Sequence, residues 1–268
     1  MKTYPIITLL TDFGLADPFV GIMKGIIYGI NPEVRIIDIS HEPPAYDILE
    51  AAFLLKASYR FFPRDTIHVI VVDPGVGSKR CPILATSDDY YFIAPDNGVL
   101  SYLYATNEIN RVIHITASHY FLKPVSATFH GRDIFAPVAA YLSKGIEPSC
   151  FGEELSNYIR LEVPRPRLQP GGVLEGEVVR VDRFGNLITS FEERDIAAFL
   201  KGKAPGAIQI RIGEQTIMGL CSCFADGRGD QPGALIGSLG HLEIFIREGS
   251  ARERLGKGRG EKVLIDLL

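Results

Sequence analysis

The stretch Ile67-His68-Val69-Ile70-Val71-Val72-Asp73-Pro74-Gly75-Val76-Gly77 decides the fold of the first half of the chain. It begins with a run dominated by valine and isoleucine, which is typical of a strand buried on both faces. The run ends at an aspartate followed by proline and glycine, residues that end strands and form turns. Strands of this kind belong to parallel sheets covered by helices, so the stretch predicts an α/β domain.

Two strand-and-helix units precede this strand. In the first, a short apolar run leads into a helix expected over residues 18–30 with Asp17 as its cap. In the second, a strand-like run at 34–39 leads into a helix over residues 48–59 with Asp47 as its cap. Alternating strands and helices imply right-handed crossovers and a mostly parallel sheet, in which sites gather at the carboxyl ends of the strands.

The rest of the chain divides in two. Further strands are expected near 83–86, 90–94 and 112–115, and a helix over 133–144. Proline and glycine then mark a linker at 164–172, beyond which strand-like runs occur at 178–181, 187–190, 208–212 and 242–246. We therefore predict an α/β amino-terminal domain with a mostly parallel sheet over residues 1–165, and a small all-β barrel or sandwich over residues 166–268.

Composition excludes several classes of partner. The net charge of −4 and the mean hydropathy of +0.13 are those of an ordinary folded protein, without the basic surface that nucleic acid requires. No apolar run approaches the roughly 18 residues of a membrane span, and no signal peptide is recognised. Four scattered cysteines fit a reducing compartment. We expect a cytoplasmic protein that binds neither nucleic acid nor membrane.

Three segments place carboxylates or histidine beside glycine at the ends of predicted elements. They contain Asp12, Asp73 with Arg80, and His130. Convergence at one sheet edge would bring them together, but each also has a bland interpretation: a turn cap for Asp12, an Asx-turn for Asp73, and a helix-entry residue for His130. The spacing matches neither a dinucleotide fingerprint nor a phosphate loop. The residues alone therefore predict a site but do not identify the reaction that it performs.

The motifs taken together are more specific, because they occur in a fixed order along nearly the whole chain. They are Thr11-Asp12-Phe13-Gly14 with Asp17, Asp73-Pro74-Gly75-Val76-Gly77, Ala94-Pro95-Asp96-Asn97-Gly98, Thr128-Phe129-His130-Gly131-Arg132-Asp133, Asp182 with Phe184-Gly185-Asn186, and Ser238 to Glu243. In these motifs the chain closely resembles the S-adenosyl-L-methionine (SAM) hydroxide adenosyltransferase family of adenosine-forming SAM hydrolases, which is related to the SAM-dependent fluorinase and chlorinase.

The resemblance implies a fold, an assembly and a reaction. It implies an α/β domain followed by a β-barrel, assembled as a homotrimer with SAM between the large domain of one subunit and the barrel of its neighbour. Water or hydroxide would attack the ribose C5′ to give adenosine and L-methionine, with SAM as substrate and without metal or cofactor. The implied catalytic residues are Asp73, Arg80 and His130. The implied substrate-binding residues are Asp12 at the ribose, Asn186 and Ser238 around adenosine or methionine, Glu243 at the methionine ammonium, Ile246 at the adenine edge, and Phe184 as a stacking ring.

Three other functions stay open at this point. A SAM halogenase shares the fold, but halogenases resemble one another in lacking the loop aspartate and the histidine before Gly131. A metal-dependent hydrolase could use Asp12, Asp73, Asp96 and His130, although no compact ligand spacing supports it. A SAM-binding regulator without turnover is the third. One departure from the family is the stretch Phe245-Ile246-Arg247 in place of a sequence like Ala-Val-Asn, which puts the adenine contacts there in doubt.

Overall fold

The computed structural model describes residues 4–268, which form two compact units, one ending at Val163 and the other beginning at Pro164. Each unit has its own sheet and its own buried apolar core. The predicted α/β character of the first half and all-β character of the second are confirmed.

The first unit is built on a mixed sheet. Its described strands are β1 (Ile6–Thr11), β2 (Arg35–Ser40), β3 (Thr66–Val71), β4 (Pro82–Thr86), β5 (Tyr90–Pro95), β6 (Arg111–Ile115) and β7 (Gly152–Glu154), in the order β2-β1-β3-β5-β4-β6-β7. β1, β2, β3 and β5 pair in parallel, whereas β4 and β7 run against their neighbours. The sheet is therefore mostly parallel in direction, as predicted.

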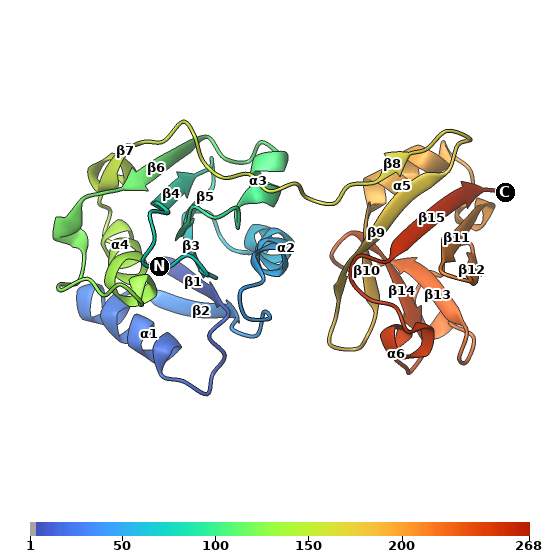
Figure 1. Ribbon diagram of the computed structural model, residues 1–268, viewed down its shortest axis with the longest axis horizontal. Coiled ribbons are helices and arrows are strands. Elements are labelled where there is room, and N and C mark those ends of the chain that lie inside the picture. Colours follow the sequence, from blue (N-terminus) through green and yellow to red (C-terminus); the bar gives the residue numbers. More distant parts are fainter. Residues whose placement is uncertain (1–3) are drawn as a thin grey trace. The chain divides into compact units, whose positions relative to one another are not determined.

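Helices cover both faces of this sheet. They are α1 (Phe19–Ile30), α2 (Ile48–Ser58), α3 (Ser101–Ala105) and α4 (Ala136–Leu142). α1 and α4 lie together on one face, and α2 and α3 lie on the other (Figure 1). Apolar side chains of β1, β3, α1 and α4 form one buried cluster, which includes Leu9, Val69, Met23 and Val138. Thr11 pairs with Val71 at the ends of β1 and β3, so the residues that follow these two parallel strands emerge side by side.

Two details of the helices differ from prediction. Asp17 does not cap α1: the cap is Pro18, whose carbonyl accepts from Ile22 N (2.9 Å), and no side chain caps the helix. The helix expected over 133–144 is preceded by a π-helical segment, Gly131–Phe135. Pro137 explains the irregularity, since it has no N–H to give to the Asp133 carbonyl, which accepts instead from Leu122 N (2.9 Å). The predicted Asp47 cap is confirmed, with Asp47 Oδ1 accepting from Glu50 N (3.0 Å).

The second unit is an antiparallel barrel. Its described strands are β8 (Arg167–Leu168), β9 (Leu174–Val181), β10 (Leu187–Glu192), β11 (Ile208–Ile212), β12 (Gln215–Met218), β13 (Pro232–Ile236), β14 (His241–Ile246) and β15 (Lys262–Leu267). The order is β12-β11-β15-β9-β10-β14-β13, with β8 beside β9. Just beyond β12, Cys221 N donates to Ala234 O on β13 (2.7 Å), a bond that joins the two ends of this order. Two short helices, α5 (Glu193–Leu200) and α6 (Ala251–Leu255), were not predicted.

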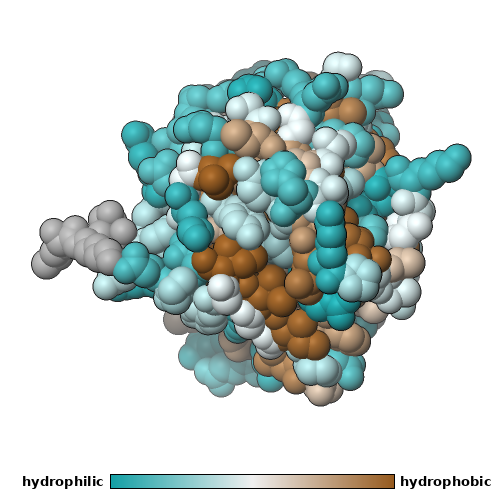
Figure 2. All heavy atoms as spheres, turned by 90° about the vertical axis from the view of Figure 1, so that its left-hand side faces the viewer, coloured by the Kyte–Doolittle hydropathy of each residue, from teal (hydrophilic) through white to brown (hydrophobic). Residues whose placement is uncertain are grey.

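The surface of the first unit is mixed in polarity. Figure 2 shows one face, on which apolar side chains gather in a band bordered by hydrophilic ones. The exposed apolar side chains of this unit include Leu15, Tyr28, Leu122 and Val125. Within residues 4–268, no helix has the length and apolar character needed to cross a membrane.

Candidate active site

The loop that follows β3 carries two of the predicted catalytic residues. Asp73 begins the loop and Arg80 ends it, and both side chains are more than nine-tenths buried. Gly77 lies between them with φ of +77°, and a Cβ at this position would be 2.3 Å from the carbonyl oxygen of Ala127. This glycine therefore allows the loop to pack directly against the segment that leads to His130.

The structure brings Asp73, Arg80 and His130 together. Arg80 Nε donates to Asp73 Oδ1 (2.9 Å), and Arg80 Nη2 donates to Asp73 Oδ2. The same Nη2 lies 2.7 Å from His130 Nδ1. The remaining guanidinium nitrogen of Arg80, Nη1, is buried and has no hydrogen-bond partner among the described residues. One cation thus connects a carboxylate with an imidazole and keeps a donor available.

These contacts fix the state of His130. Arginine has only donors, so Nδ1 of His130 must accept, and a neutral imidazole with this bond carries its proton on Nε2. Burial, and then the positive charge of Arg80, hold the pKa of His130 below its ordinary value, although Asp73 and Asp133 act in the opposite direction. His130 is therefore neutral at pH 7.

The support for His130 comes from the residues that follow it. Asp133 is fully buried and accepts from Arg132 Nε (2.6 Å) and from Ser126 N (2.8 Å). It thereby ties the start of the π-helical segment to the preceding loop. π-helical turns are frequent at functional sites, because the extra residue changes the direction in which neighbouring side chains point.

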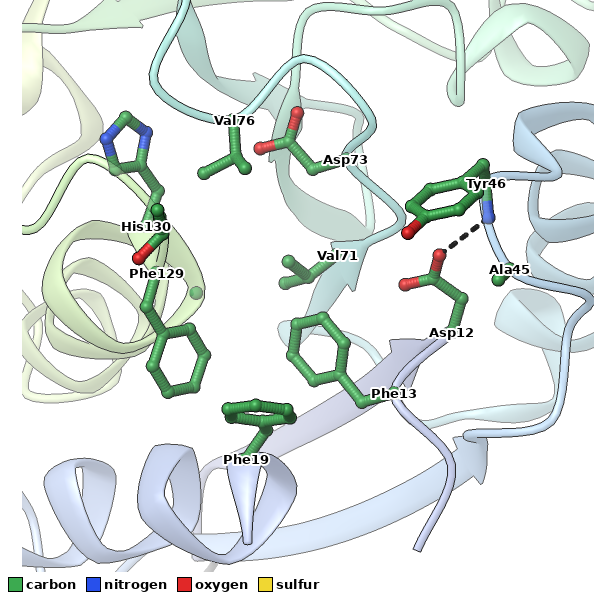
Figure 3. Close-up of a pocket in the computed structure, with 12 residues that line it drawn as sticks. Asp12, Phe13, Phe19, Ala45, Tyr46, Val71, Asp73, Val76, Phe129 and His130 are labelled. Carbon is green, nitrogen blue, oxygen red and sulfur yellow. Dashed lines mark hydrogen bonds between the residues drawn. The ribbon is translucent and has the colours of Figure 1, made fainter. Parts of the chain in front are cut away.

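A cavity of about 280 Å³ opens beside this cluster. Figure 3 shows Asp73, Val76 and His130 on one side of it and the rings of Phe13, Phe19 and Phe129 on the other. The three rings contact one another edge to face, with centroids 5.3 to 5.9 Å apart. The cavity therefore has an apolar aromatic wall facing a charged, hydrogen-bonded one.

Asp12 lies at the edge of the cavity next to Tyr46 (Figure 3). It follows β1, and its Oδ2 accepts from Tyr46 N (2.8 Å), which leaves Oδ1 for a ligand. Tyr46 has a positive φ of 69°, a conformation that is uncommon for a residue with a side chain and that concentrates at functional sites. Its ring is largely exposed.

Several residues that line this cavity were not singled out from the sequence. Tyr46 and Phe19 belong to no motif identified there, and Phe13, Val76 and Phe129 were only neighbours of the charged residues. Single aromatic residues at helix starts and in loops are common in any apolar core, so nothing in the sequence separates these rings from ordinary packing residues. The unusual backbone of Tyr46 has no sequence signal, because no glycine stands at or next to this position.

The predicted binding residues of the second half line a cavity within the barrel unit. This cavity has a volume of about 810 Å³, and Phe184, Asn186, Ser238, Glu243 and Ile246 all line it. Phe184 is exposed in a turn after β9, whereas Asn186, Glu243 and Ile246 are buried. The sequence-predicted residues are therefore divided between two cavities, one in each unit, except for Arg80, which lines neither of them.

Asp182 organises the turn that presents Asn186. Its Oδ1 accepts from Phe184 N (2.9 Å) and Asn186 N (2.8 Å), and its Oδ2 accepts from Asn186 Nδ2 (3.0 Å). The amide oxygen of Asn186 takes part in none of these bonds and keeps its acceptor capacity.

Glu243 is the most unusual charge in the barrel cavity. Burial, and then the nearby carboxylate of Asp182, raise the pKa of Glu243, although Arg180 acts in the opposite direction. Gly237 packs against this carboxyl so closely that an added Cβ would lie 1.9 Å from Glu243 Oε1. A cationic ligand group would relieve the cost of the buried negative charge.

The stretch that departs from the family has a structural explanation. Phe245 is fully buried and packs against Phe224 with ring centroids 5.0 Å apart. An added Cβ at Gly227 or Gly233 would lie 2.8 Å from the Phe245 ring. The large side chain is thus accommodated by two glycines inside the unit, while Ile246 lines the cavity.

Among residues 4–268 no group of three or more histidine, cysteine, aspartate or glutamate side chains is arranged to hold a metal ion. Asp12, Asp73, Asp96 and His130, the possible ligands considered from sequence, do not form such a group. Asp73 and His130 are instead bonded to Arg80.

Comparison with known proteins identifies two family domains in the chain. Residues 7–152 match the model of the SAM hydroxide adenosyltransferase N-terminal domain, and residues 176–264 match that of its C-terminal domain. An (R)-S-adenosyl-L-methionine hydrolase from Salinispora tropica is 34% identical, with 99% of each chain covered. A fluorinase from Actinoplanes sp. is 27% identical, with 90% of each chain covered.

A solved structure agrees with this relationship. The crystal structure of an uncharacterized conserved protein from Thermotoga maritima is 34% identical, has a TM-score of 0.90, and covers 97% of this chain and 99% of its own. With both family domains matched in order and relatives aligned along nearly the whole length, the chain belongs to the SAM hydroxide adenosyltransferase family.

Proposed function

We propose that the protein hydrolyses SAM, with water or hydroxide attacking the ribose C5′ and with adenosine and L-methionine as products. The observation that carries this proposal is the cluster in which Arg80 connects Asp73 and His130 beside a cavity. The greater similarity to a named SAM hydrolase (34%) than to a named fluorinase (27%) supports it.

The difficult part of this reaction is the activation of the nucleophile. The O–C5′ bond forms as the C5′–S bond breaks, and the bonding pair moves to the sulfonium sulfur, so methionine leaves as a neutral thioether and needs no proton. Water, with a pKa of about 15.7, must be oriented and must gain hydroxide character as it attacks. A carboxylate and a cation at one position can both orient the water and give it hydroxide character.

We infer a role for each of the three residues. Asp73 accepts the water proton, since its oxygens keep acceptor capacity beside the Arg80 bonds. Arg80 directs its buried Nη1 donor at the oxygen and stabilises its negative charge. His130 does not take the proton through Nδ1, because that atom accepts from Arg80, and it holds the guanidinium in place.

The two cavities suggest how SAM binds. We propose that Asp12 accepts from the ribose hydroxyls through its unoccupied Oδ1, and that Asn186, Ser238 and the backbone of Ile246 contact adenosine or methionine. Glu243 would pair with the methionine ammonium, and Phe184 would stack on a ring. Asp12 lines the cavity of the first unit, whereas the other five residues line the cavity of the barrel unit.

We therefore also propose a homotrimer, in which SAM lies between the first unit of one subunit and the barrel unit of its neighbour. The division of the binding residues between two cavities and the apolar band of Figure 2 support this assembly. The four cysteines are free thiols, which supports a reducing, cytoplasmic location.

The deciding experiment is incubation of the purified protein with SAM in H₂¹⁸O. We expect adenosine and methionine in equal amounts, with ¹⁸O at the 5′ position of adenosine, because the water oxygen becomes the 5′ hydroxyl. A 5′-halogenated deoxyadenosine formed in fluoride or chloride would instead establish a halogenase. Binding of SAM without any product would establish a regulator.

A parallel reaction after exhaustive chelation tests whether the reaction needs a metal ion. We propose that neither a metal nor an organic cofactor takes part, because a neutral leaving group needs no Lewis acid. Unchanged turnover is expected. Loss of turnover that added Mg²⁺ or Zn²⁺ restores would establish the metal-dependent alternative.

A further inference from the structure

The loop from Asp73 to Arg80 is held at both ends by one dipeptide, Asp96-Asn97. Asn97 Nδ2 donates to the carbonyl of Val72, the residue before the loop (2.8 Å). Asp96 N donates to the carbonyl of Cys81, the residue after the loop (2.8 Å). Val72 and Cys81 flank the two residues proposed to activate water.

Sheet topology explains why one dipeptide reaches both ends. In the order β3-β5-β4, the loop connects β3 to β4 and so crosses over the end of β5. The dipeptide follows β5 directly and therefore lies between the two stems of the loop. The bond from Asp96 extends the β4–β5 ladder, whose last pair is Pro82 with Pro95. On the other side the β3–β5 ladder stops at Val69 with Ile93, and the Asn97 side chain provides the bond beyond it.

The dipeptide is in turn fixed by the last segment of the first unit. Asp96 Oδ1 accepts from Ile159 N (2.9 Å), and Ser101 Oγ accepts from Leu161 N (2.8 Å). Gly98 has φ of +93°, and a Cβ there would lie 2.4 Å from Leu161 Cγ. This close contact leaves the dipeptide little freedom to move independently of residues 159–161.

We infer that Asn97 is a positioning residue, which sets the distance and direction of Asp73 and Arg80 relative to His130 by holding the loop at Val72. The inference rests on the proposed hydrolysis for its activity readout. Asn97 contacts neither of the two residues through its side chain, so it acts through the backbone of the loop and not on substrate.

A purely structural role for Asn97 must be distinguished from this one. Its Oδ1 also accepts from Val99 N (3.2 Å), a local turn contact that many asparagines make. The variant Asn97→Asp keeps an oxygen for this contact and removes the donor to Val72. Asn97→Ala removes both contacts.

Asn31 provides a matched control. It is buried at the end of α1, its Nδ2 donates to Ser143 Oγ (2.8 Å), and its Oδ1 accepts from Glu33 N two residues on (3.1 Å). Asn31→Ala thus also removes one donated bond, here to a hydroxyl, and one accepted backbone bond, at a place that lines neither cavity.

The experiment compares the four proteins by kinetics and by hydrogen–deuterium exchange. We expect Asn97→Asp and Asn97→Ala to lower kcat for SAM by about 10- to 100-fold with KM within about twofold of wild type, since misplacement of a catalytic group by about 1 Å costs up to this much. Peptides covering residues 72–81 should exchange faster in both variants. Asn31→Ala should change neither readout, at a similar loss of thermal stability.

Normal kcat in Asn97→Asp, or an equal loss in Asn31→Ala, would overturn the inference. Unchanged exchange at residues 72–81 would overturn it as well, and this readout does not require turnover. If wild-type protein gives no adenosine, the proposed function fails, while the exchange experiment still decides whether Asn97 holds the loop.

Discussion

Arg80 connects the three candidate catalytic side chains through a single guanidinium group. It donates to both oxygens of Asp73 and to Nδ1 of His130, and it keeps Nη1 without a partner among the described residues. Arginine stays protonated at all ordinary pH values, so the charge of Arg80 does not change when Asp73 or His130 is altered. Each of the two partners can therefore be tested separately.

Replacement of Asp73 tests proton acceptance directly. Asp73→Asn keeps the shape of the side chain but removes the charged acceptor. We expect kcat to fall by about 10²- to 10⁴-fold, the usual contribution of general base catalysis, with KM for SAM little changed. Steady-state assays of adenosine formation measure this. A kcat near that of wild type would show that Asp73 does not accept the proton.

The pH dependence of the reaction should report His130. Since burial and Arg80 lower its folded pKa, the neutral form persists as pH falls past the ordinary value of about 6.5. Activity should be lost only when pH falls through the lowered folded pKa, as protonation removes the acceptor for Arg80. The stabilising contribution of the neutral ring should decrease as pH falls from about 6.5 to that folded pKa, because the unfolded chain binds the proton first. A pH profile of kcat/KM whose acid limb centres at or above about 6.5 would contradict this.

Replacement of Glu243 should weaken the binding of SAM without lowering the stability of the fold. Its folded pKa is raised, so its own contribution to the unfolding free energy is greatest at low pH and is lost as pH rises through that folded pKa. Glu243→Gln should raise KM for SAM about tenfold or more by removing the partner of the ammonium, yet leave the unfolding midpoint at pH 8 equal or higher. Thermal denaturation and Michaelis kinetics together measure this. Lower stability with normal KM would assign the residue to folding alone.

Sequence reasoning predicted the charged residues of the site better than its apolar ones. Asp12, Asp73 and His130 stand in motifs next to glycine, at places where parallel strands end or a helix begins, and the structure places all three on one cavity. Tyr46 and Phe19 gave no such signal, because their importance depends on which distant side chains face them. The bond from Arg80 to His130 spans 50 positions and is likewise a tertiary property.

At the scale of elements, two loops at one sheet edge determine the site. The loop after β3 carries Asp73 and Arg80, and the loop before the π-helical segment carries His130. They touch at Gly77, where the left-handed backbone and the Ala127 carbonyl leave no space for a side chain. This contact between two backbones therefore fixes the middle of the loop, whereas Asn97 holds its start at Val72.

Gly77→Ala should separate the two loops. The added methyl group meets the Ala127 carbonyl and also imposes strain at positive φ, so we expect kcat to fall about 100-fold or more. Gly145→Ala is the control, since its φ is +88° but nothing lies within 4 Å of an added Cβ. It should cost similar backbone strain, measured by thermal unfolding, with normal kcat. Equal kcat in both variants would show that the contact at Gly77 is unimportant.

The elements themselves could be predicted where their pattern is strong. Buried strands such as β3 and β14 are rich in apolar and β-branched residues, and Asp47 provides a clear helix start. α5 was missed because it begins with a capping box of two acidic residues, Glu192 and Asp195, where serine or threonine is the usual first member. The π-helical segment depends on where a displaced carbonyl finds its donor, which sequence does not show.

At the scale of the whole molecule, the proposed trimer predicts the mass of the particle and the activity of mixed subunits. Size-exclusion chromatography with light scattering should give three times the chain mass of 29.5 kDa. If each site combines two subunits, mixing Asp73→Asn with Glu243→Gln under conditions of subunit exchange should restore activity, because some sites then combine two wild-type halves. A monomer, or mixtures with no more than the summed activities, would contradict shared sites.

The closure of the second unit has a consequence for aggregation. Free strand edges are templates on which other chains can add strands, and proteins protect them by covering, shortening or charging them. The bond from Cys221 N to Ala234 O joins the two ends of the barrel order, so this unit offers no long open edge there. Association at this closed edge must therefore use side chains, and side-chain surfaces discriminate between partners in a way that a bare peptide edge does not.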